Sequence, residues 1–313
     1  MKDINLTKIK IGGGIVAAIL TPALAHACAC GCGIVDVATS SLFPQGSGGM
    51  AFVNYGYQDQ NQNWSGNERA QSANNPDKEI ETHFGTLGLQ YMFNDDWGAR
   101  VEVPVWNRTF RTDISDTATP DVVSRNWTGL SDIRLKGIYT GLSPDQSSGL
   151  TFGVKLPTGS INHFGDVVDR DTEMGTGSTD ILLGAFHRDQ FGRSRWNWFV
   201  QADVEIPALT MGGYRPGAEF DGAGGIYYTG LHIGGVKIAP TLQIIGSIRG
   251  RDSGSGADPN GSGYQRILLV PGIEFDVHPV RFFVNAELPV YVNANGNQLV
   301  APVLLQTGVS YIF

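Results

Sequence analysis

Three cysteines are the residues of this chain whose type and spacing most directly suggest chemistry. Cys28, Cys30 and Cys32 stand at every second position of "AHACACGCGIVD", and they are the only cysteines among the 313 residues. Closely spaced thiolates bind soft metals such as Cu(I), or zinc when outside ligands complete the site. A disulfide between two cysteines so close together closes a strained ring, and strained disulfides are labile. The pattern therefore predicts soft-metal or redox chemistry.

The residues before the cysteines have the features of an export signal. Lys2, Lys8 and Lys10 are followed by an apolar run at 15–20 and by the small-residue site Ala25-His26-Ala27. Cleavage there makes Cys28 the first residue of an exported chain, which meets an oxidising compartment. Lipidation of Cys28 is therefore a second interpretation, although Ala25 stands where lipoprotein signals favour leucine. An intermolecular disulfide, or no function for the thiols, also stays open.

Alternation of apolar and polar residues determines the expected fold class. In "RWNWFVQADVEIP", apolar residues from Trp196 to Ile206 alternate with polar residues from Asn197 to Glu205. This period of two is typical of a strand with one apolar and one polar face. Twelve segments fit the same description, near residues 50–58, 81–93, 97–110, 127–141, 149–157, 178–188, 195–208, 223–233, 236–250, 265–277, 280–293 and 299–313.

The connections between these segments alternate between short and long. An even number of strands, tight turns at one end and longer polar loops at the other are typical of bacterial outer-membrane barrels. Aromatic residues such as Trp97, Trp196, Phe282 and Tyr311 lie beside the short turns and predict an interfacial girdle. We therefore predict an all-β fold, a transmembrane antiparallel up-and-down barrel of about 12 strands. Closure leaves no strand edge unpaired in lipid.

The end of the chain supports the same prediction. Val309, Tyr311 and Phe313 share an apolar face in "LLQTGVSYIF". A terminal strand that ends on an outward aromatic resembles the signal read by the assembly machinery of bacterial outer-membrane barrels. We expect that machinery and outer-membrane lipid as partners. With an even strand number, both termini are expected in the periplasm.

Three internal motifs resemble a known family. They are "GLSDIRLKGIYTGL" at 129–142, "KLPTG" at 155–159 and "GTGSTDILLGAFHRDQFG" at 175–192. In this order they resemble motifs of the outer-membrane family named for the meta-pathway of phenol degradation, where they mark the points at which strands meet loops. The resemblance implies a β-barrel and the passage of small, often aromatic, compounds. The cysteine-rich opening is not part of the family pattern.

The polar face of the strands predicts the lining of the barrel. Positive and negative side chains are nearly balanced on it, so the sequence indicates either charges that pair across strands and fill a narrow barrel, or the walls of a narrow polar channel. The candidate lumen-lining residues are Arg100, Glu102, Arg134, Lys136, Asp203, Glu205, Arg266, Glu274, Arg281 and Glu287.

One long loop carries a second candidate metal site. Asp166, Asp169, Asp171 and Glu173 offer oxygen ligands of the kind that calcium prefers. Their spacing lacks the turn glycine of an EF-hand loop, so a solvated acidic loop is the simpler interpretation.

Other function classes fit the sequence poorly. The formal net charge of −8 argues against nucleic acid as a partner, because nucleic-acid binding requires a basic face. Lipases built on barrels need a serine, a histidine and an orienting polar group on the lipid-facing wall. No histidine stands in a His-x-Ser pair, so we expect no enzyme activity and no catalytic residue.

These observations divide the chain into three parts. Residues 1–27 are the expected signal peptide, 28–49 a cysteine-rich periplasmic segment or plug, and 50–313 the barrel. The expected function is a passive outer-membrane channel for small solutes, aromatic or hydrophobic ones among them. The alternative is a largely closed barrel that anchors the Cys-x-Cys-x-Cys segment for soft-metal binding, redox chemistry or attachment of a partner. No other cofactor is expected.

The cysteine hypothesis predicts a measurable metal stoichiometry. Reduced, purified protein should bind Cu(I) at about one equivalent, because three thiolates complete a trigonal site. Replacement of Cys28, Cys30 and Cys32 together by serine should abolish binding without impairing barrel assembly, since none lies in a predicted strand. Intact-mass spectrometry of the same samples tests the alternative. An acylated Cys28, or unchanged copper binding in the triple variant, would contradict the three-thiolate site.

Overall fold

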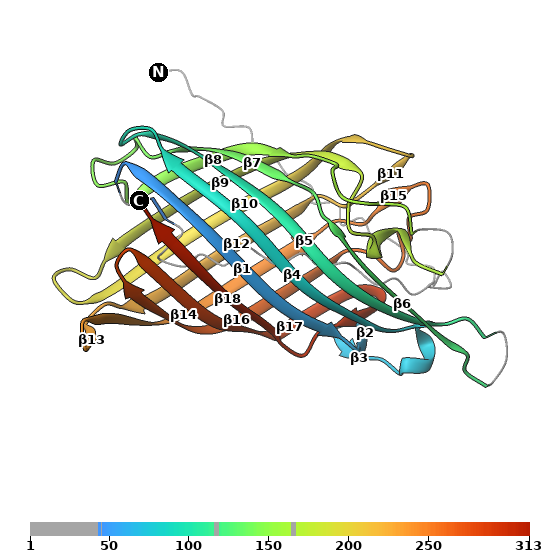
Figure 1. The fold of residues 1–313 in the computed structure, drawn as a ribbon. Helices are drawn as coiled ribbons and strands as arrows, with labels where there is room; N and C mark the ends of the chain where they lie inside the picture. The colour runs from blue at the N-terminus through green and yellow to red at the C-terminus, as the bar shows by residue number, and fades with distance from the viewer. Residues whose placement is uncertain (1–42, 45, 116–118, 164–166) are drawn as a thin grey trace, which may run out of the picture.

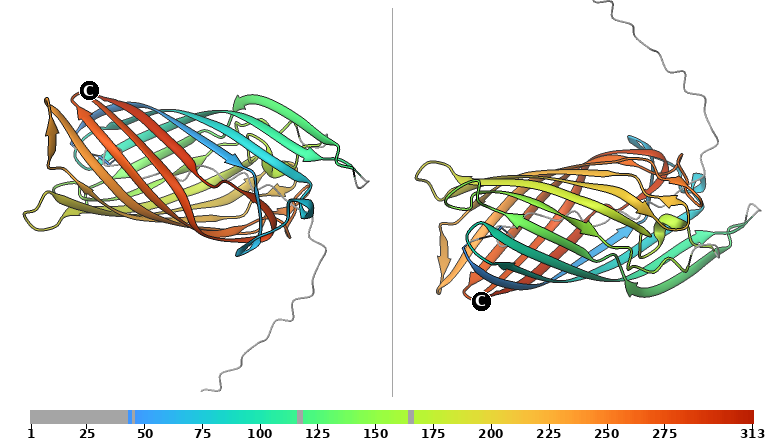
Figure 2. Two further views of the ribbon diagram at one scale, coloured as in Figure 1. Left: turned by 90° about the horizontal axis from the view of Figure 1, so that it is seen from below. Right: turned by 90° about the horizontal axis from the view of Figure 1, so that it is seen from above.

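The chain forms a closed antiparallel β-barrel, seen from three sides in Figures 1 and 2. The computed structural model describes residues 43–44, 46–115, 119–163 and 167–313. No helix among them is long and apolar enough to cross a membrane. Twelve strands form the wall: β1 (Gly48–Gln60), β4 (Asp77–Met92), β5 (Trp97–Asp113), β7 (Arg134–Tyr139), β8 (Ser148–Lys155), β9 (Ser178–Gln190), β10 (Trp196–Thr210), β12 (Glu219–Tyr228), β14 (Val236–Arg249), β16 (Tyr264–Val277), β17 (Val280–Val300) and β18 (Leu304–Ile312).

The barrel closes between its first and last strands. Each wall strand pairs antiparallel with its neighbours in sequence order, and β18 returns to pair with β1 from Met50↔Ile312 to Gln58↔Leu304. Gly49 and Phe313 exchange two backbone hydrogen bonds of 2.7 and 2.9 Å at the end of this seam. The predicted fold class is thus confirmed, including the number of wall strands.

The two ends of the barrel differ as the sequence predicted. Tight turns join the strands at one end, here called the short-turn end, and longer segments join them at the other, the long-loop end (Figure 1). The long-loop end also carries the short elements β2 (Gln62–Gly66), β3 (Glu68–Arg69), η1 (Ser72–Asn74), η2 (Arg170–Thr172), β11 (Tyr214–Arg215) and β15 (Ser253–Gly254), and the short-turn end carries β13 (Leu231–Ile233).

Two wall strands differ from their predictions near the long-loop end. The expected strand 127–141 is interrupted at residues 131–133, so that β6 (Val122–Leu130) and β7 pair separately with β5. The predicted last strand 299–313 also divides, because residues up to Val300 belong to β17 and pair with β2. Both differences arise near the long-loop end, where loop contacts replace the regular ladder.

The outer surface is apolar around the whole circumference. Each wall strand exposes at least one large apolar side chain by a third or more: Val53, Leu87, Val105, Leu135, Phe152, Leu183, Val200, Phe220, Ile244, Ile267, Val284 and Val309. The alternate residues face inward and are mostly polar. This is the inverse of a water-soluble fold and is the pattern that hydrocarbon requires.

The facing of β10 can be tested by a pair of substitutions. Val200 is 46% exposed on the outer surface, whereas Gln201 faces inward and its amide donates to Asp203. Val200→Arg should destabilise the barrel by about 2–4 kcal/mol because it places a charge in the apolar band. Gln201→Arg should cost far less, since its guanidinium lies beside Asp203. Urea unfolding in detergent micelles measures both, and equal losses would mean that the strand register is wrong.

Candidate functional site

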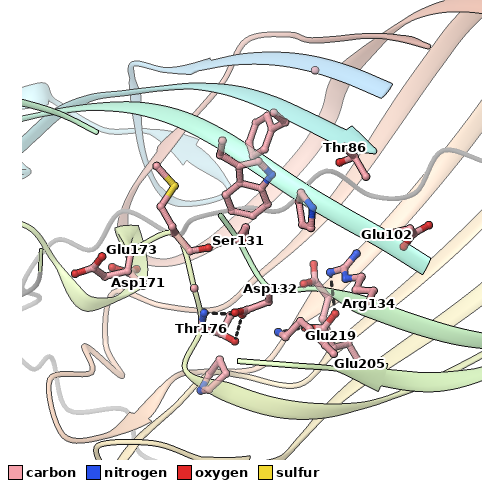
Figure 3. A pocket seen from close by; sticks show the side chains of 18 of the residues that line it. Thr86, Glu102, Ser131, Asp132, Arg134, Asp171, Glu173, Thr176, Glu205 and Glu219 are labelled. Carbon is pink, nitrogen blue, oxygen red and sulfur yellow. Dashed lines mark hydrogen bonds and ion pairs between the residues drawn. The ribbon is translucent and has the colours of Figure 1, made fainter. Parts of the chain in front are cut away.

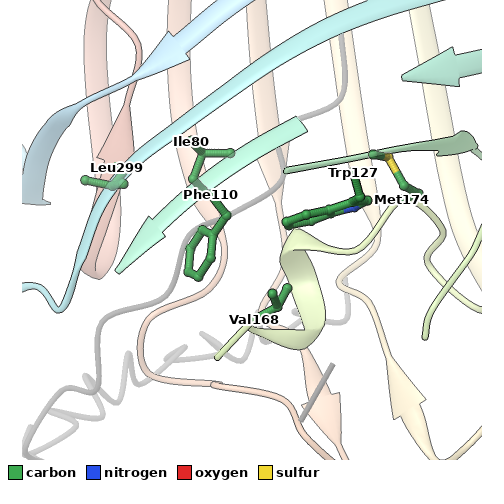
Figure 4. Packing of buried hydrophobic residues seen from close by; sticks show 6 residues of the cluster. All are labelled: Ile80, Phe110, Trp127, Val168, Met174 and Leu299. Atoms are coloured by element: carbon green, nitrogen blue, oxygen red, sulfur yellow. The ribbon is translucent and has the colours of Figure 1, made fainter. Parts of the chain in front are cut away.

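The loop between β8 and β9 folds into the long-loop end of the barrel. Val168 and Met174 of this loop are 5% and 2% exposed, and they pack with Ile80 and Phe110 of the wall and with Trp127 of β6 (Figure 4). Ile80 and Phe110 face inward, where a channel wall would otherwise be polar. The apolar contact therefore holds the described part of the loop inside the mouth instead of above it.

A buried arginine supports the same loop. Arg108 of β5 is 1% exposed, and its guanidinium donates to the carbonyl oxygens of Thr172 and Glu173 at 2.6 and 3.1 Å. It also donates to the Thr82 hydroxyl at 3.0 Å and lies 5.6 Å from the Trp106 ring centre. Backbone carbonyls of a loop are an effective partner for a fixed cation, so Arg108 orders η2 and the residues after it.

The interruption between β6 and β7 provides the main attachment of the loop. The Asp132 carboxylate accepts a hydrogen bond from the Gly159 amide at 2.9 Å. It also accepts from the Thr176 amide at 2.7 Å and the Thr176 hydroxyl at 2.6 Å (Figure 3). A buried carboxylate is costly unless it is satisfied in this way. Asp132, which is 3% exposed, thus joins both ends of the loop to the broken strand.

Two further contacts complete this junction. The Thr158 hydroxyl donates to the Ser131 carbonyl at 3.0 Å and accepts from the Ile133 amide at 2.9 Å. A side chain on Gly159 would come within 2.5 Å of the Gly175 Cα atom, so only glycine allows the two ends of the loop to lie this close. The three family-like motifs, which lie far apart in sequence, therefore meet at one point.

The loop also contacts other segments of the long-loop end. The Arg170 guanidinium lies 4.3 Å from the ring centre of Tyr214 in β11, and the Tyr214 hydroxyl donates to Asp252 at 2.7 Å. Burial raises the pKa of Tyr214, and the Asp252 charge adds to the rise. Burial likewise raises the pKa of Asp169, with a further contribution from the Asp258 charge. The mouth is therefore a packed assembly of loops.

Below the loop lies an internal cavity of about 150 Å³ with two kinds of wall. One part of the lining is apolar: Phe84, Pro104, Trp106, Met174 and Phe283. Another part carries charges from β5, β7, β8 and β10: Glu102, Arg134, Lys155 and Glu205. Figure 3 shows Glu102, Arg134 and Glu205 together with Asp132. An amphipathic cavity of this kind binds compounds that combine an apolar body with polar groups.

The charges at the cavity neutralise one another. The Lys155 ammonium group lies between Asp180, at 2.5 Å, and Glu205, and Arg134 pairs with Glu205 at 3.0 Å. Glu102 has Arg100 at 3.5 Å and Lys136 at 3.6 Å. Because each of these charges is compensated by a neighbour, this part of the wall presents no strong attraction for free ions of either sign.

The ten candidate lumen residues all occupy inward-facing strand positions, but they lie in different places. Glu102, Arg134 and Glu205 line the cavity just described, with Arg100 and Lys136 bonded to Glu102. Arg266 and Glu287 line a second, smaller cavity, while Glu274 and Arg281 line one at the short-turn end. Asp203 accepts a hydrogen bond from Gln201. The sequence did not predict that Arg108 and Asp132 would hydrogen-bond the inserted loop, or that Met174 would pack inside the mouth.

The structure leaves the two predicted metal sites untested. The three cysteines and Asp166 lie outside the described residues. Asp169 is half-buried, and the Glu173 carboxylate lies 3.1 Å from His163 Nδ1. In the part of the chain that is described, no group of three or more His, Cys, Asp or Glu side chains is placed to hold a metal ion.

One serine and histidine pair lies on the outer wall. The Ser148 hydroxyl is 2.7 Å from His187 Nδ1, on neighbouring strands near the short-turn end. Within the described ranges, no side chain hydrogen-bonds the other nitrogen of His187, so the arrangement lacks the orienting group of a catalytic triad.

Part of the N-terminal segment lies inside the barrel. Phe43 is 6% exposed and packs against the inward rings of Phe186, Phe199 and Tyr227. The Pro44 carbonyl accepts from Arg188 at 3.0 Å, and the Gly46 amide donates to Gln146 of a short turn at 2.5 Å. The described residues of this segment therefore narrow the lumen at the short-turn end, opposite the inserted loop.

Comparison with solved structures agrees with the fold. The chain is similar to the COG4313 outer membrane channel from Pseudomonas putida F1, with a TM-score of 0.62 and 14% identity over 86% of this chain and 96% of that one. It is also similar to the β domain of the Bordetella autotransporter BrkA, with a TM-score of 0.52 and 13% identity over 85% of this chain and 100% of that one.

These neighbours establish the class of the protein. The fold is that of a bacterial outer-membrane β-barrel, and the low identities carry the likeness no further than fold. No family model matches the sequence, and no curated protein matches it either.

The junction at Asp132 predicts how the inserted loop is released. Asp132→Asn should free the loop, because the amide nitrogen cannot accept hydrogen bonds from Thr176. Loss of a charge-assisted bond worth about 1.5–3 kcal/mol should speed tryptic cleavage after the buried Arg170 by about tenfold or more. Asp95→Asn, in an exposed short turn, is the control. Equal cleavage of both variants and the native protein would show that Asp132 does not hold the loop.

Proposed function

We propose that this protein is an outer-membrane channel for small solutes that carry an apolar ring and polar groups. The observation that carries the proposal is the internal cavity, whose apolar lining lies beside a neutralised charged wall inside a closed barrel. The similar fold of an outer membrane channel supports it. The motifs that resemble the phenol-degradation family, and that meet at Asp132, agree with this solute class.

The size of the cavity indicates the size of the solute. A volume of about 150 Å³ equals that of an engineered apolar cavity that accepts benzene. A single ring therefore fits between Phe84, Trp106 and Met174, with its polar group toward Arg134 or Glu205. Since the charges of the wall are paired, selection rests on the ring and its hydrogen bonds more than on net charge.

The orientation in the membrane follows from the asymmetry of the two ends. In outer-membrane barrels the tight turns are periplasmic and the long loops extracellular. On this assignment solutes enter past the inserted loop and leave beside Phe43. Both constrictions consist of side chains packed against the wall, so passage requires side chains at each of them to move.

Uptake of amino acids with different side chains tests the proposal. Phenylglycine, serine and glutamate share a charged group and cross lipid slowly, so their entry into proteoliposomes reports the channel. Phenylglycine should enter at least as fast as the smaller serine, because its ring gains contact with Phe84 and Trp106. Trp106→Ala should remove this advantage, while the outward Trp97→Ala should not.

Two outcomes would contradict the channel as proposed. Entry in strict order of size would exclude selection by the apolar wall. No entry of any solute, with no single-channel conductance, would instead support the closed barrel that anchors its N-terminal segment.

A further inference from the structure

The ring of Phe43 occupies a site built by three wall strands. Its centre lies 5.1 Å from that of Phe186 in β9 and 5.6 Å from that of Phe199 in β10, and Phe199 lies 6.4 Å from Tyr227 in β12. These three wall residues face inward at adjacent register positions and are 9% or less exposed. The wall therefore forms a receptacle for one aromatic ring, with tilted contacts of the kind that aromatic pairs favour.

A cation stands at the edge of this receptacle. Arg188 of β9 lies two residues after Phe186, on the same face, and its guanidinium donates to the Pro44 carbonyl at 3.0 Å. Within the described residues, Arg188 takes part in no ion pair. The described partners of the guanidinium, the Pro44 carbonyl and the Tyr227 hydroxyl, carry no charge. A carboxylate would offer it two charged oxygens in matching geometry.

The space beyond Arg188 carries an excess of positive charge. Arg188 and Tyr227 also line the cavity at the short-turn end, together with Lys237, Arg281, Glu274 and Asp276. Asp276 is neutralised by Lys237 at 4.0 Å and by Arg281 at 3.5 Å. Among the described residues that line this space, three cations face two carboxylates.

We propose that Phe186, Phe199, Tyr227 and Arg188 form a binding site for an aromatic carboxylate, whose ring and carboxylate take the places of the Phe43 ring and the Pro44 carbonyl. The inference deepens the proposed channel function by naming the class of solute at its short-turn end. The chain itself supplies the occupant in the resting state, so a solute binds by displacing Phe43.

The occupied positions explain why an aromatic acid fits better than other solutes. A neutral arene fills the ring position but offers no hydrogen-bond acceptor to Arg188. An aliphatic acid satisfies Arg188 but loses the ring contacts with Phe186 and Phe199. A benzoate-like anion satisfies both at once, because its ring contacts the aromatic side chains and its carboxylate pairs with the guanidinium.

Calorimetric titration of the full-length protein in detergent micelles tests the site, with benzoate as the probe. Phe43→Ala should tighten benzoate binding by about tenfold or more, because the competing ring is gone. Phe43→Leu should give a smaller gain. Phe93→Ala, at an exposed position on the outer surface, should bind as the native protein does. Phe43 precedes the first strand, so these variants should keep the heat-modifiable mobility of a folded barrel.

A second substitution distinguishes the contribution of the Arg188 cation to binding from that of the aromatic contacts. Adding Arg188→Gln to Phe43→Ala should weaken benzoate binding by about tenfold while leaving benzyl alcohol within a few fold. Cyclohexanecarboxylate should bind Phe43→Ala more weakly than benzoate. Equal loss of benzoate and benzyl alcohol, equal affinity for the two acids, or no change on removal of Phe43 would each overturn the site.

The titration does not depend on transport, so the two proposals fail separately. Binding of benzoate without entry of phenylglycine into proteoliposomes would exclude the channel and keep the site. Ring-selective entry of phenylglycine without binding of benzoate by Phe43→Ala would exclude the site and keep the channel.

Discussion

The constraint on which the whole structure depends is that no backbone hydrogen-bonding group can stay unpaired in hydrocarbon. An open sheet of this length would expose a strand edge, so the last strand must return to the first. The bonds between Gly49 and Phe313 and the ladder above them provide that closure. Once the barrel is closed, the alternation along each strand assigns one set of side chains to lipid and the other to the interior.

That assignment places many polar side chains in the interior, where they need hydrogen-bond or ion-pair partners. Ion pairs such as those of Lys155 with Asp180 and Glu205 neutralise charges that would be costly alone. Toward the long-loop end the wall changes character, and Ile80 and Phe110 receive apolar residues of the inserted loop. Toward the short-turn end, inward rings receive Phe43. The interior thus has three regions. Apolar packing fills the long-loop end, paired charges line the middle of the barrel, and aromatic packing fills the short-turn end.

The sequence predicted the closed barrel, its strands and their facing, because a period of two over ten residues is a local signal that tertiary contacts seldom override. It also placed all ten candidate lumen residues at inward positions, since parity along a strand decides facing. It did not predict the interruption at residues 131–133 or the insertion of the loop. Those features depend on contacts between Asp132, Gly159 and Thr176, which no local pattern encodes. The order of the three family-like motifs was the only sequence signal for this junction. It marked the residues as important but did not show that they contact one another.

The Asp132 junction also has a consequence for the order of assembly. Its partners Gly159 and Thr176 lie on the two ends of the loop that joins β8 to β9, so the carboxylate can be satisfied only after β7, β8 and β9 stand side by side. Contacts between residues distant in sequence form late, because the entropy of closing the intervening chain must first be overcome. Docking of the loop on Asp132 therefore follows the pairing of β7, β8 and β9, which leaves the nascent mouth open until this part of the wall is complete.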